Sequence, residues 1–250
     1  MTKIFVINLK SSIERRQNIS HQLDELFLHF EFFSAIDGRM SPPHPLLKRY
    51  NDDLSQTYRA KTLSAGQLGC YASHFLLWEK CVELNQPIII IEDDALIFKE
   101  TFINFIQDIP ELPNHIECIR LFKNKRRKYR SYSIFECSST RIHKFTKGHM
   151  SATGYFLTPS GAKKLLNNSN EWYMAVDIYM DRFWINDVEC YGTAAPCLTN
   201  DPKFESDIGY EKRTTTRNLF KKCKREWFNL NESIRRHFHN ARFSFTRNKL

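Results

Sequence analysis

The sequence predicts an α/β protein with three layers, a mixed and mainly parallel central sheet, and a basic helical appendage at its C-terminus. Four consecutive isoleucines, Ile88–Ile91, are typical of a strand that is buried on both faces of a parallel sheet. Strand-like and helix-like segments alternate over residues 3–106, as they do in βαβ units. The net charge of +9 lies wholly in residues 211–250, where twelve Lys and Arg stand against three Glu.

The first elements form a predicted βαβ unit. Residues 4–9 have the pattern of a strand, and Ser11–Glu14 has the spacing of a capping box for a helix that ends near Phe27. Residues 30–36 predict a second strand, which ends at Asp37-Gly38. Because such crossovers are right-handed and join parallel strands, we expect these two strands to be parallel.

The middle of the chain begins with a predicted loop. Residues 39–62 contain a cluster of prolines and show no clear periodicity. Ser64–Gln67 is a second capping signature, for a helix that ends near Asn85. The strand that begins at Ile88 and a shorter helix over residues 98–106 follow.

The second half of the chain shows weaker patterns. They predict, in order, a strand at 116–122, a basic loop at 123–133, a strand at 151–158, a helix at 159–168 with proline in its first turn, a helix at 176–185 and a strand at 188–192. Residues 1–210 hold 25 basic and 25 acidic side chains. We therefore expect one neutral globular domain over 1–210 and a separate basic tail over 211–250.

Composition limits the class of protein. A hydrophobic content of 42% and an aromatic content of 14% argue against global disorder. No apolar stretch approaches the ~20 residues that span a bilayer, and the first residues lack the pattern of a signal peptide. The seven cysteines include no Cys-x-x-Cys pair, which predicts reduced thiols in a cytoplasmic protein.

Three carboxylates, Glu92, Asp93 and Asp94, follow the isoleucine strand directly. Adjacent carboxylates repel one another, and a hard divalent cation relieves this repulsion by binding to their oxygens. Ligands of open α/β sheets bind beyond the carboxyl ends of the strands. The run therefore predicts a metal-assisted site for an anionic ligand such as a nucleotide diphosphate, with an acidic turn that caps the next element as the alternative.

Several blocks of sequence share the pattern of one family. In chain order they are Asn8-Leu9 with Ser12-x-Glu14-Arg15-Arg16, Phe32-Phe33-x-Ala35-x-Asp37-Gly38, a block from Leu63 to Trp78 that contains Ser73-His74, and Pro87-x-x-x-x-Glu92-Asp93-Asp94. They resemble glycosyltransferase family 25, which contains bacterial lipooligosaccharide glycosyltransferases and is related to collagen galactosyltransferases. Weaker matches at Gly154-Tyr155 and Val176-Asp177 extend the resemblance over residues 3–208.

The resemblance implies a GT-A-like fold that transfers a hexose with inversion from a UDP-sugar, most often UDP-galactose, to a lipooligosaccharide acceptor. It also implies Mn²⁺ or Mg²⁺ held by Asp94 and Glu92, with Glu92 on the ribose or uridine side of the donor. Asp93 remains a catalytic candidate beside Asp94, because a shift of one residue turns a side chain to the opposite face of a strand.

The remaining candidate residues each have an alternative role. Asp177 is the candidate general base, since burial among apolar neighbours raises the pKa of a carboxyl, and a helix N-cap is the alternative. The expected donor-binding residues are Asn8, Arg15, Arg16, Asp37, Ser73, His74 and Glu92. The two arginines lie where a helix N-terminus would bind diphosphate. The alternatives are a solvated charge for one arginine, an Asp-Gly turn for Asp37 and a core histidine for His74.

Basic residues gather in two further segments. Residues 123–130 contain six Lys or Arg, and we expect first a solvated loop, then contact with an anionic acceptor or membrane, and last nucleic acid. In the tail, residues 211–250, apolar side chains recur every three to four residues between basic ones. This pattern predicts an amphipathic helix on an anionic membrane surface, with packing against the domain as the alternative. We therefore expect a peripheral protein on the cytoplasmic face of the inner membrane.

Two other classes of protein explain less of this sequence. A nucleic-acid-binding protein would use the basic tail and loop, but it explains neither the neutral body nor Glu92–Asp94, so we expect no nucleic-acid partner. A sugar nucleotidyltransferase shares metal-binding carboxylates and an α/β sheet. It should carry a glycine-rich phosphate loop near the N-terminus, whereas Asn8–Ser12 contains no glycine.

Overall fold

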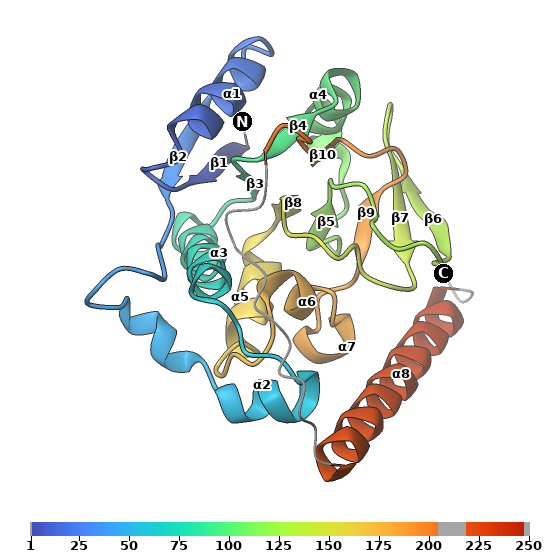
Figure 1. Cartoon of the computed structure of the whole chain (residues 1–250). Helices are drawn as coiled ribbons and strands as arrows, with labels where there is room; N and C mark the ends of the chain where they lie inside the picture. Colours follow the sequence, from blue (N-terminus) through green and yellow to red (C-terminus); the bar gives the residue numbers. More distant parts are fainter. Residues whose placement is uncertain (1, 205–218, 248–250) are drawn as a thin grey trace.

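The computed structural model describes residues 2–204 and 219–247. Helices cover both faces of a central sheet, and one long helix lies along the outside (Figure 1). The strands are β1 (Lys3–Asn8), β2 (Phe30–Ser34), β3 (Ile88–Glu92), β4 (Ala95–Ile97), β5 (Cys118–Arg120), β6 (Ser131–Glu136), β7 (Arg141–Phe145), β8 (Gly154–Leu157), β9 (Tyr191–Thr193) and β10 (Leu198–Asn200). The α-helices are α1 (Ile13–Asp24), α2 (Asp52–Arg59), α3 (Ala65–Leu84), α4 (Lys99–Asp108), α5 (Pro159–Asn167), α6 (Val176–Met180), α7 (Phe183–Asn186) and α8 (Leu219–Arg247).

The central sheet has eight strands in the order β2-β1-β3-β8-β5-β9-β7-β6. Strand β1 is parallel to β2 and β3, as predicted for the first βαβ unit, and β5 is parallel to β9. The other four neighbouring pairs are antiparallel. The sheet is therefore mixed, but the prediction that it is mainly parallel is wrong. A short buried strand such as β8 has the same residue pattern in either direction, so the sequence does not show which way it runs.

Alternate residues of the buried strands pack on opposite faces of the sheet. All four isoleucines of β3 are fully buried. Ile88 and Ile90 pack with residues of α3 and α5, whereas Ile89 and Ile91 pack with residues of α1 and α4. A strand that is covered on both faces needs apolar residues at every position, which is why this one lacks polar alternation. The predicted three-layer arrangement is confirmed.

Two of the N-terminal predictions need correction. The capping box at Ser11–Glu14 does not form: Ser12 is the N-cap residue of α1 without a side-chain capping bond, and the Glu14 carboxylate pairs with Lys203. The predicted loop at 39–62 contains α2, whose N-cap residue Asn51 accepts a hydrogen bond from the Leu54 amide. The capping box at Ser64–Gln67 is present in full.

The second half of the chain is more finely divided than its sequence predicts. The helix expected at 176–185 is two short helices, α6 and α7. Between them, the Asp181 carboxylate accepts hydrogen bonds from the Arg120 side chain and from the amide of His149. The last predicted strand is confirmed only as β9. Strands β4, β6, β7 and β10 were not predicted, and β4 and β10 pair with each other outside the main sheet.

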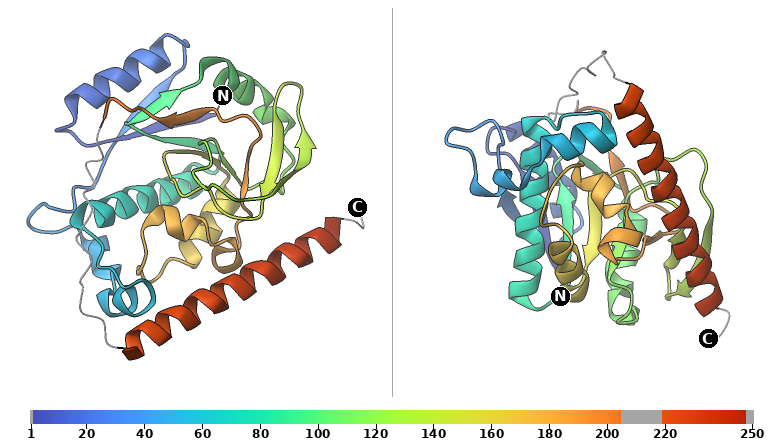
Figure 2. Two further views of the ribbon diagram at one scale, coloured as in Figure 1. Left: turned by 45° about the vertical axis from the view of Figure 1, so that its right-hand side comes forward. Right: turned by 90° about the horizontal axis from the view of Figure 1, so that it is seen from below.

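Helix α8 lies along the outside of the molecule, between α2 at one end and β6 and β7 at the other (Figure 2). It packs on the domain through one face, which is the alternative that the sequence analysis gives for the tail. The predicted boundary between residues 210 and 211, together with 211–218 and 248–250, lies outside the described residues. Within the described ranges, no helix is long and apolar enough to cross a membrane.

Candidate functional site

A cleft opens where β1, β2 and β3 end and α3 begins, and it encloses about 630 Å³ of empty space, open solvent included. Six predicted site residues line it, namely Arg15, Asp37, Ser73, Glu92, Asp93 and Asp94. Asn8, Arg16, His74 and Asp177 are not part of this lining. The edge of the sheet predicted to bind a ligand is therefore hollow and rich in carboxylates.

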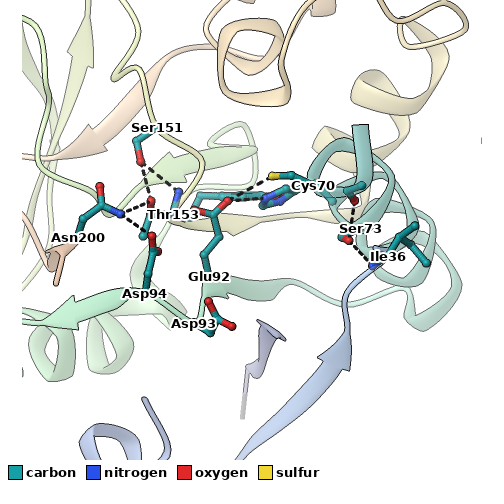
Figure 3. A network of polar contacts seen from close by, with 12 residues as sticks. Ile36, Cys70, Ser73, Glu92, Asp93, Asp94, Ser151, Thr153 and Asn200 are labelled. Atoms are coloured by element: carbon teal, nitrogen blue, oxygen red, sulfur yellow. Dashed lines mark hydrogen bonds and ion pairs between the residues drawn. The ribbon is translucent and has the colours of Figure 1, made fainter. Parts of the chain in front are cut away.

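Asp94 holds one carboxylate oxygen that the described part of the chain leaves without a hydrogen-bond partner. Its Oδ2 accepts a hydrogen bond of 3.2 Å from Asn200 (Figure 3), whereas its buried Oδ1 accepts none from residues 2–204 or 219–247. Burial, followed by the negative charge of Glu92, raises the pKa of Asp94 to about 7. A buried carboxylate oxygen that lacks a donor is suited to a cation.

Asp93 points away from Asp94, toward α1 (Figure 3). Its carboxylate accepts hydrogen bonds from the Asn8 amide, at 2.7 Å, and from the Arg15 guanidinium, at 3.3 Å. Burial raises the pKa of Asp93, and the bonds from Asn8 and Arg15 oppose that rise. Asp93 thus joins the end of β3 to α1 and fixes Arg15 at the cleft wall, while its catalytic role remains a prediction.

Arg16 has a different environment from Arg15. Its guanidinium lies 3.6 Å from the centre of the Phe32 ring and donates a 3.4 Å hydrogen bond to the Asn8 side chain. These contacts tie α1 to β2 and β1 and keep Arg16 out of the cleft lining. Of the two arginines, Arg15 is the one whose position allows direct contact with a ligand in the cleft.

A chain of buried hydrogen bonds ends on Glu92. The Trp78 indole donates to the Tyr155 hydroxyl at 2.9 Å, that hydroxyl lies 2.8 Å from His74 Nδ1, and His74 Nε2 lies 3.2 Å from Glu92 Oε1. Every atom is satisfied if Tyr155 donates to Nδ1 and His74 donates to Glu92. Burial alone would raise the pKa of Glu92, but the contacts with His74, together with the hydrogen bonds from Thr153 and Cys70, lower that pKa.

His74 therefore acts on the cleft through Glu92. The imidazole is fully buried, and its ring nitrogens meet Tyr155 and Glu92. The core-histidine alternative thus describes its burial, while its bond to Glu92 links it to the predicted donor site. Cys70, one helical turn before His74 on α3, lies with its sulfur 3.6 Å from the same Glu92 oxygen. In the described ranges, Cys70, His74 and Glu92 form the one group of three or more ligand-type side chains that is close enough to hold a metal ion.

Ser73 and Asp37 line the opposite wall of the cleft. The Ser73 hydroxyl accepts a hydrogen bond from the Ile36 amide and donates one to the Gly69 carbonyl, both at 2.8 Å. It therefore joins the segment after β2 to α3. The Asp37 carboxylate accepts hydrogen bonds from the side chain and the amide of Arg39, which lower the pKa of Asp37. These contacts form a local turn at Asp37, which is the alternative role predicted for this residue. The turn lies at the rim of the cleft.

A second hollow adjoins the cleft at the N-terminus of α1. It shares Leu9, Arg15 and Arg39 with the cleft and adds Lys203 on its far side. The amides at the start of a helix and nearby cations favour an anion. The predicted diphosphate position therefore lies beside the carboxylate cleft and is continuous with it.

Asp177 lies in the first turn of α6, and Ala175 is the N-cap residue of that helix, so the N-cap alternative is wrong. Burial, followed by the charge of Asp181, raises the pKa of Asp177, and the charge of Glu92 adds to this effect. In turn, Asp177 adds to the raised pKa of Cys70. Asp177 is thus electrostatically coupled to the cleft without lining it, and its role as base remains a prediction.

The basic loop is only partly a solvated loop. Arg126 pairs with Asp181 at 3.3 Å and donates a hydrogen bond to the Gly148 carbonyl. The charge of Lys125 acts on Asp94 and opposes the rise in its pKa. The loop is therefore anchored at Arg126, and Lys125 is near enough to influence the cleft.

Sequence reasoning missed several residues that shape the site. Asn200, Thr153 and Ser151 form a polar network beside Asp94 (Figure 3). Tyr155, which the sequence marks only as part of a weak family match, supports His74. Asn200 belongs to β10, which was not predicted, so no local signal marked it. The spacing of Cys70 and His74, four residues apart on a predicted helix, was the one signal available for that cluster.

The fold and the cleft together define an α/β protein with a cleft at the carboxyl ends of its parallel strands, which is where such sheets bind their ligands. The chain belongs to glycosyltransferase family 25: the model described as "Glycosyltransferase family 25 (LPS biosynthesis protein)" matches residues 1–180. The resemblance noted in the sequence is thereby confirmed. The matched part includes the cleft residues Arg15, Asp37, Glu92 and Asp94.

Curated relatives agree with this family. A glycosyltransferase 25 family member of Aedes aegypti is 28% identical over 84% of this chain and 37% of its own length. Procollagen galactosyltransferase 1 of Danio rerio is 25% identical over 87% of this chain and 39% of its own length. The lipooligosaccharide biosynthesis protein lic2B of Haemophilus influenzae is 25% identical over 70% of this chain and 68% of its own length. The chain thus spans less than two fifths of the two animal relatives.

Proposed function

We propose that this chain transfers a hexose, galactose from UDP-galactose, with inversion onto a lipooligosaccharide acceptor, using a GT-A-like fold. Membership of the family supports glycosyl transfer. The names of the Danio rerio and Haemophilus influenzae relatives support the galactose donor and the lipooligosaccharide acceptor respectively. The main structural support is the Asp94 oxygen that has no hydrogen-bond partner among the described residues, in a cleft that also contains Arg15.

The cleft suits a divalent cation, Mn²⁺ or Mg²⁺. Asp94 is the first proposed ligand because its Oδ1 is buried and lacks a donor among the described residues. Glu92 is the second, since its low pKa keeps it charged. A cation bound there would offset the negative charge that develops on the departing diphosphate. The ribose or uridine of the donor would lie on the Glu92 side.

The other donor-binding residues divide into two groups. Arg15 and the start of α1 would hold the diphosphate, because a guanidinium lies there beside the positive end of a helix. Asp37 and Ser73 would contact the uridine or ribose from the other wall. Asn8, Arg16 and His74 would act indirectly, by holding Asp93, α1 and Glu92 in place.

Asp177 is the proposed general base. The acceptor hydroxyl oxygen would attack the sugar carbon on the face opposite the diphosphate, the bond to the diphosphate would break, and the hydroxyl proton would pass to the Asp177 carboxylate. A raised carboxyl pKa favours this role because it makes the carboxylate a stronger base. Asp93 would keep Arg15 aligned with the departing group.

The proposed place of action is the cytoplasm, on the inner face of the inner membrane. All seven cysteines are free thiols, which is typical of a reducing compartment. A cytoplasmic site also fits a donor that is a nucleotide sugar.

The test is a donor screen with a matched pair of variants. Release of UDP from several UDP-sugars is measured with lipooligosaccharide acceptor across a Mn²⁺ titration. We expect UDP-galactose to be used, and Asp94→Asn to lower kcat at least 100-fold, which corresponds to about 2.7 kcal/mol of lost transition-state stabilisation. The control is Asp53→Asn, an exposed aspartate in the first turn of α2.

Circular dichroism of both variants confirms the fold. The proposal is wrong if Asp94→Asn retains normal turnover, or if the wild-type protein works equally well after chelation of divalent cations. Use of another UDP-sugar in place of UDP-galactose would correct the donor but leave the assignment of Asp94 intact.

A further inference from the structure

Helix α8 has two faces with different partners, and the inward face is fully engaged with the domain. Glu232 is buried and pairs with Arg182 at 2.6 Å, and it accepts a hydrogen bond of 3.2 Å from the Trp184 indole. Phe228 stacks on Tyr58 with the ring centres 4.5 Å apart. These contacts determine which face of the helix is turned outward.

A second group of contacts holds the other end of the helix. His239 bonds to Glu189, and Asn240 donates a hydrogen bond of 3.1 Å to the Thr146 carbonyl. The Phe243 ring lies against the Tyr191 ring, with centres 6.3 Å apart. Both ends of α8 are therefore anchored through the same side, and the opposite side is turned to solvent.

The outward face is apolar along its whole length. Its exposed hydrophobic residues are Leu219, Trp227, Leu230, Ile234, Phe238 and Phe245. Successive members lie three, four, seven or eight residues apart, so they fall on one stripe of the helix. Trp227, Phe238 and Phe245 are each more than 70% exposed. Large aromatic side chains are seldom left in water in this number on a single helix unless they contact a partner.

The same helix is strongly basic. Residues 219–247 contain eight Lys and Arg against two Glu, and one of these Glu is the buried Glu232. Lys222, Arg235 and Arg242 are exposed beside the apolar stripe. An apolar stripe flanked by cations fits a surface that is anionic at its boundary and apolar just beneath.

We propose that the outward face of α8 binds an anionic phospholipid surface, with the helix lying in the plane of that surface. Charge complementarity favours this partner over a second copy of the chain, because two such helices face to face would bring together two basic surfaces. The helix is about 43 Å long at 1.5 Å per residue, so the stripe offers a long line of contact. The inward contacts can remain in place while the outward face binds.

The geometry also suits the aromatic residues. Tryptophan and phenylalanine insert at the boundary between headgroups and acyl chains, and lysine and arginine stay with the phosphates. Each basic residue near an anionic surface strengthens binding by about fivefold, and the effect decreases as salt screens the charges. Binding should therefore need both anionic lipid and the exposed aromatic side chains.

The experiment measures sedimentation of the full-length protein with vesicles of phosphatidylcholine, with and without phosphatidylglycerol. The test variant is Trp227→Ser with Phe238→Ser, which leaves every inward contact intact. The matched control is Phe27→Asn with Met40→Ser, which removes two exposed hydrophobic residues, 92% and 63% exposed, away from α8. Asparagine at 27 tolerates the positive φ of that position.

We expect the wild type and the control to bind vesicles that contain phosphatidylglycerol, and to lose binding in high salt. The test variant should bind at least tenfold more weakly, with an unchanged melting temperature. Equal binding by the test variant, or failure of the wild type to bind, would overturn the proposal. A concentration-dependent dimer that the test variant loses, seen by analytical ultracentrifugation without lipid, would assign the stripe to a second copy instead.

Discussion

At the scale of single residues, two carboxylates in one cleft have opposite tendencies to ionise. Glu92 has a donor in His74, which lowers its pKa despite burial. Asp94 lacks a partner for Oδ1 within the described residues, so burial and the charge of Glu92 raise its pKa to about 7. At neutral pH Glu92 is thus charged and Asp94 only partly so, and a cation would complete its ionisation.

The raised pKa of Asp94 predicts how stability depends on pH. The usual value is 3.8, so the folded state holds this proton more tightly than the unfolded state, and stability is lost as pH rises from about 4 to 7. The cost is at most about 4 kcal/mol. Asp94→Asn avoids it, and we expect the variant to gain melting temperature over the wild type at pH 8 and to gain clearly less at pH 5.

Adding Mn²⁺ at pH 8 provides the control for this effect. The cation should raise the melting temperature of the wild type, because it binds the folded state, and leave that of Asp94→Asn almost unchanged. Scanning fluorimetry at both pH values measures each difference. A gain for the variant that is the same at pH 5 and pH 8 would show that the effect is not due to ionisation of Asp94.

The proposed base predicts a second dependence on pH. Burial and the charges of Asp181 and Glu92 raise the pKa of Asp177, so the acidic limb of the kcat profile should lie above the usual aspartate range. Asp177→Asn should lower kcat by about 100- to 10,000-fold with little change in KM for the donor. The control is Asp187→Asn, an aspartate 75% exposed that follows α7.

Kinetics over a range of pH distinguishes a base from a structural residue. If the residual activity of Asp177→Asn keeps the acidic limb of the wild type, another group titrates there. Normal kcat in that variant would leave Asp177 with only the electrostatic effect on Cys70 and Glu92.

At the scale of elements, the sequence predicts correctly those helices and strands whose formation depends on residues close together in the chain. Four buried isoleucines predicted β3, and Ser64–Gln67 predicted the start of α3, because both patterns follow from neighbouring residues. Ser11–Glu14 has a similar pattern, yet α1 begins at Ile13 after a Ser12 without a side-chain capping bond. There Glu14 pairs with Lys203, a distant residue, which a local pattern does not reveal.

The missed elements are short or depend on distant partners. Strands β4 and β10 have three residues each and pair with one another across a hundred residues of chain. Helix α2 lies in a segment assigned to a loop because of the prolines before it. The carboxylate cluster was predicted, but its partner Asn200 was not, since only the tertiary fold brings β10 beside the end of β3.

Close packing of two elements at the cleft gives a prediction about glycine. A Cβ atom on Gly69 of α3 would lie 2.3 Å from the Ile36 carbonyl oxygen, and one on Gly38 would lie 2.0 Å from the Ala65 carbonyl oxygen. Backbone atoms cannot yield as a flexible side chain can. Gly69→Ala should therefore cost about 1–3 kcal/mol and displace the segment that bears Asp37, weakening donor binding.

The control for Gly69→Ala is Glu79→Ala, which changes an exposed residue of the same helix. Chemical denaturation measures the free energy of unfolding, and calorimetric titration measures how tightly the cleft binds UDP. If Gly69→Ala binds UDP as tightly as the control does, the wall between β2 and α3 does not contribute to the donor site.

At the scale of the whole molecule, the site and the outer helix are held by different kinds of contact. The cleft is built on β1 and β3, whose residues are buried in two apolar clusters on the two faces of the sheet. Helix α8 is held on the outside of the domain mainly by polar and aromatic contacts, such as the pair of Glu232 and Arg182. Composition predicted the basic amphipathic tail, but only the structure shows which face is turned outward. We expect the helix to be released more easily than the domain unfolds.

The pair of Glu232 and Arg182 tests this view of α8. Both side chains are about 10% exposed, so Glu232→Ala leaves the Arg182 charge buried without its carboxylate, at a cost of about 3–5 kcal/mol. That cost falls on docking of the helix, and trypsin should cleave α8 faster in this variant while the domain melts almost as before. The control, Glu226→Ala, removes an exposed glutamate of the same helix.

Replacing both partners, Glu232→Met with Arg182→Met, should restore much of the protection because the Arg182 charge is then no longer buried without its carboxylate. Equal cleavage of Glu232→Ala and Glu226→Ala would show that the aromatic contacts alone, such as Phe228 on Tyr58, hold the helix in place.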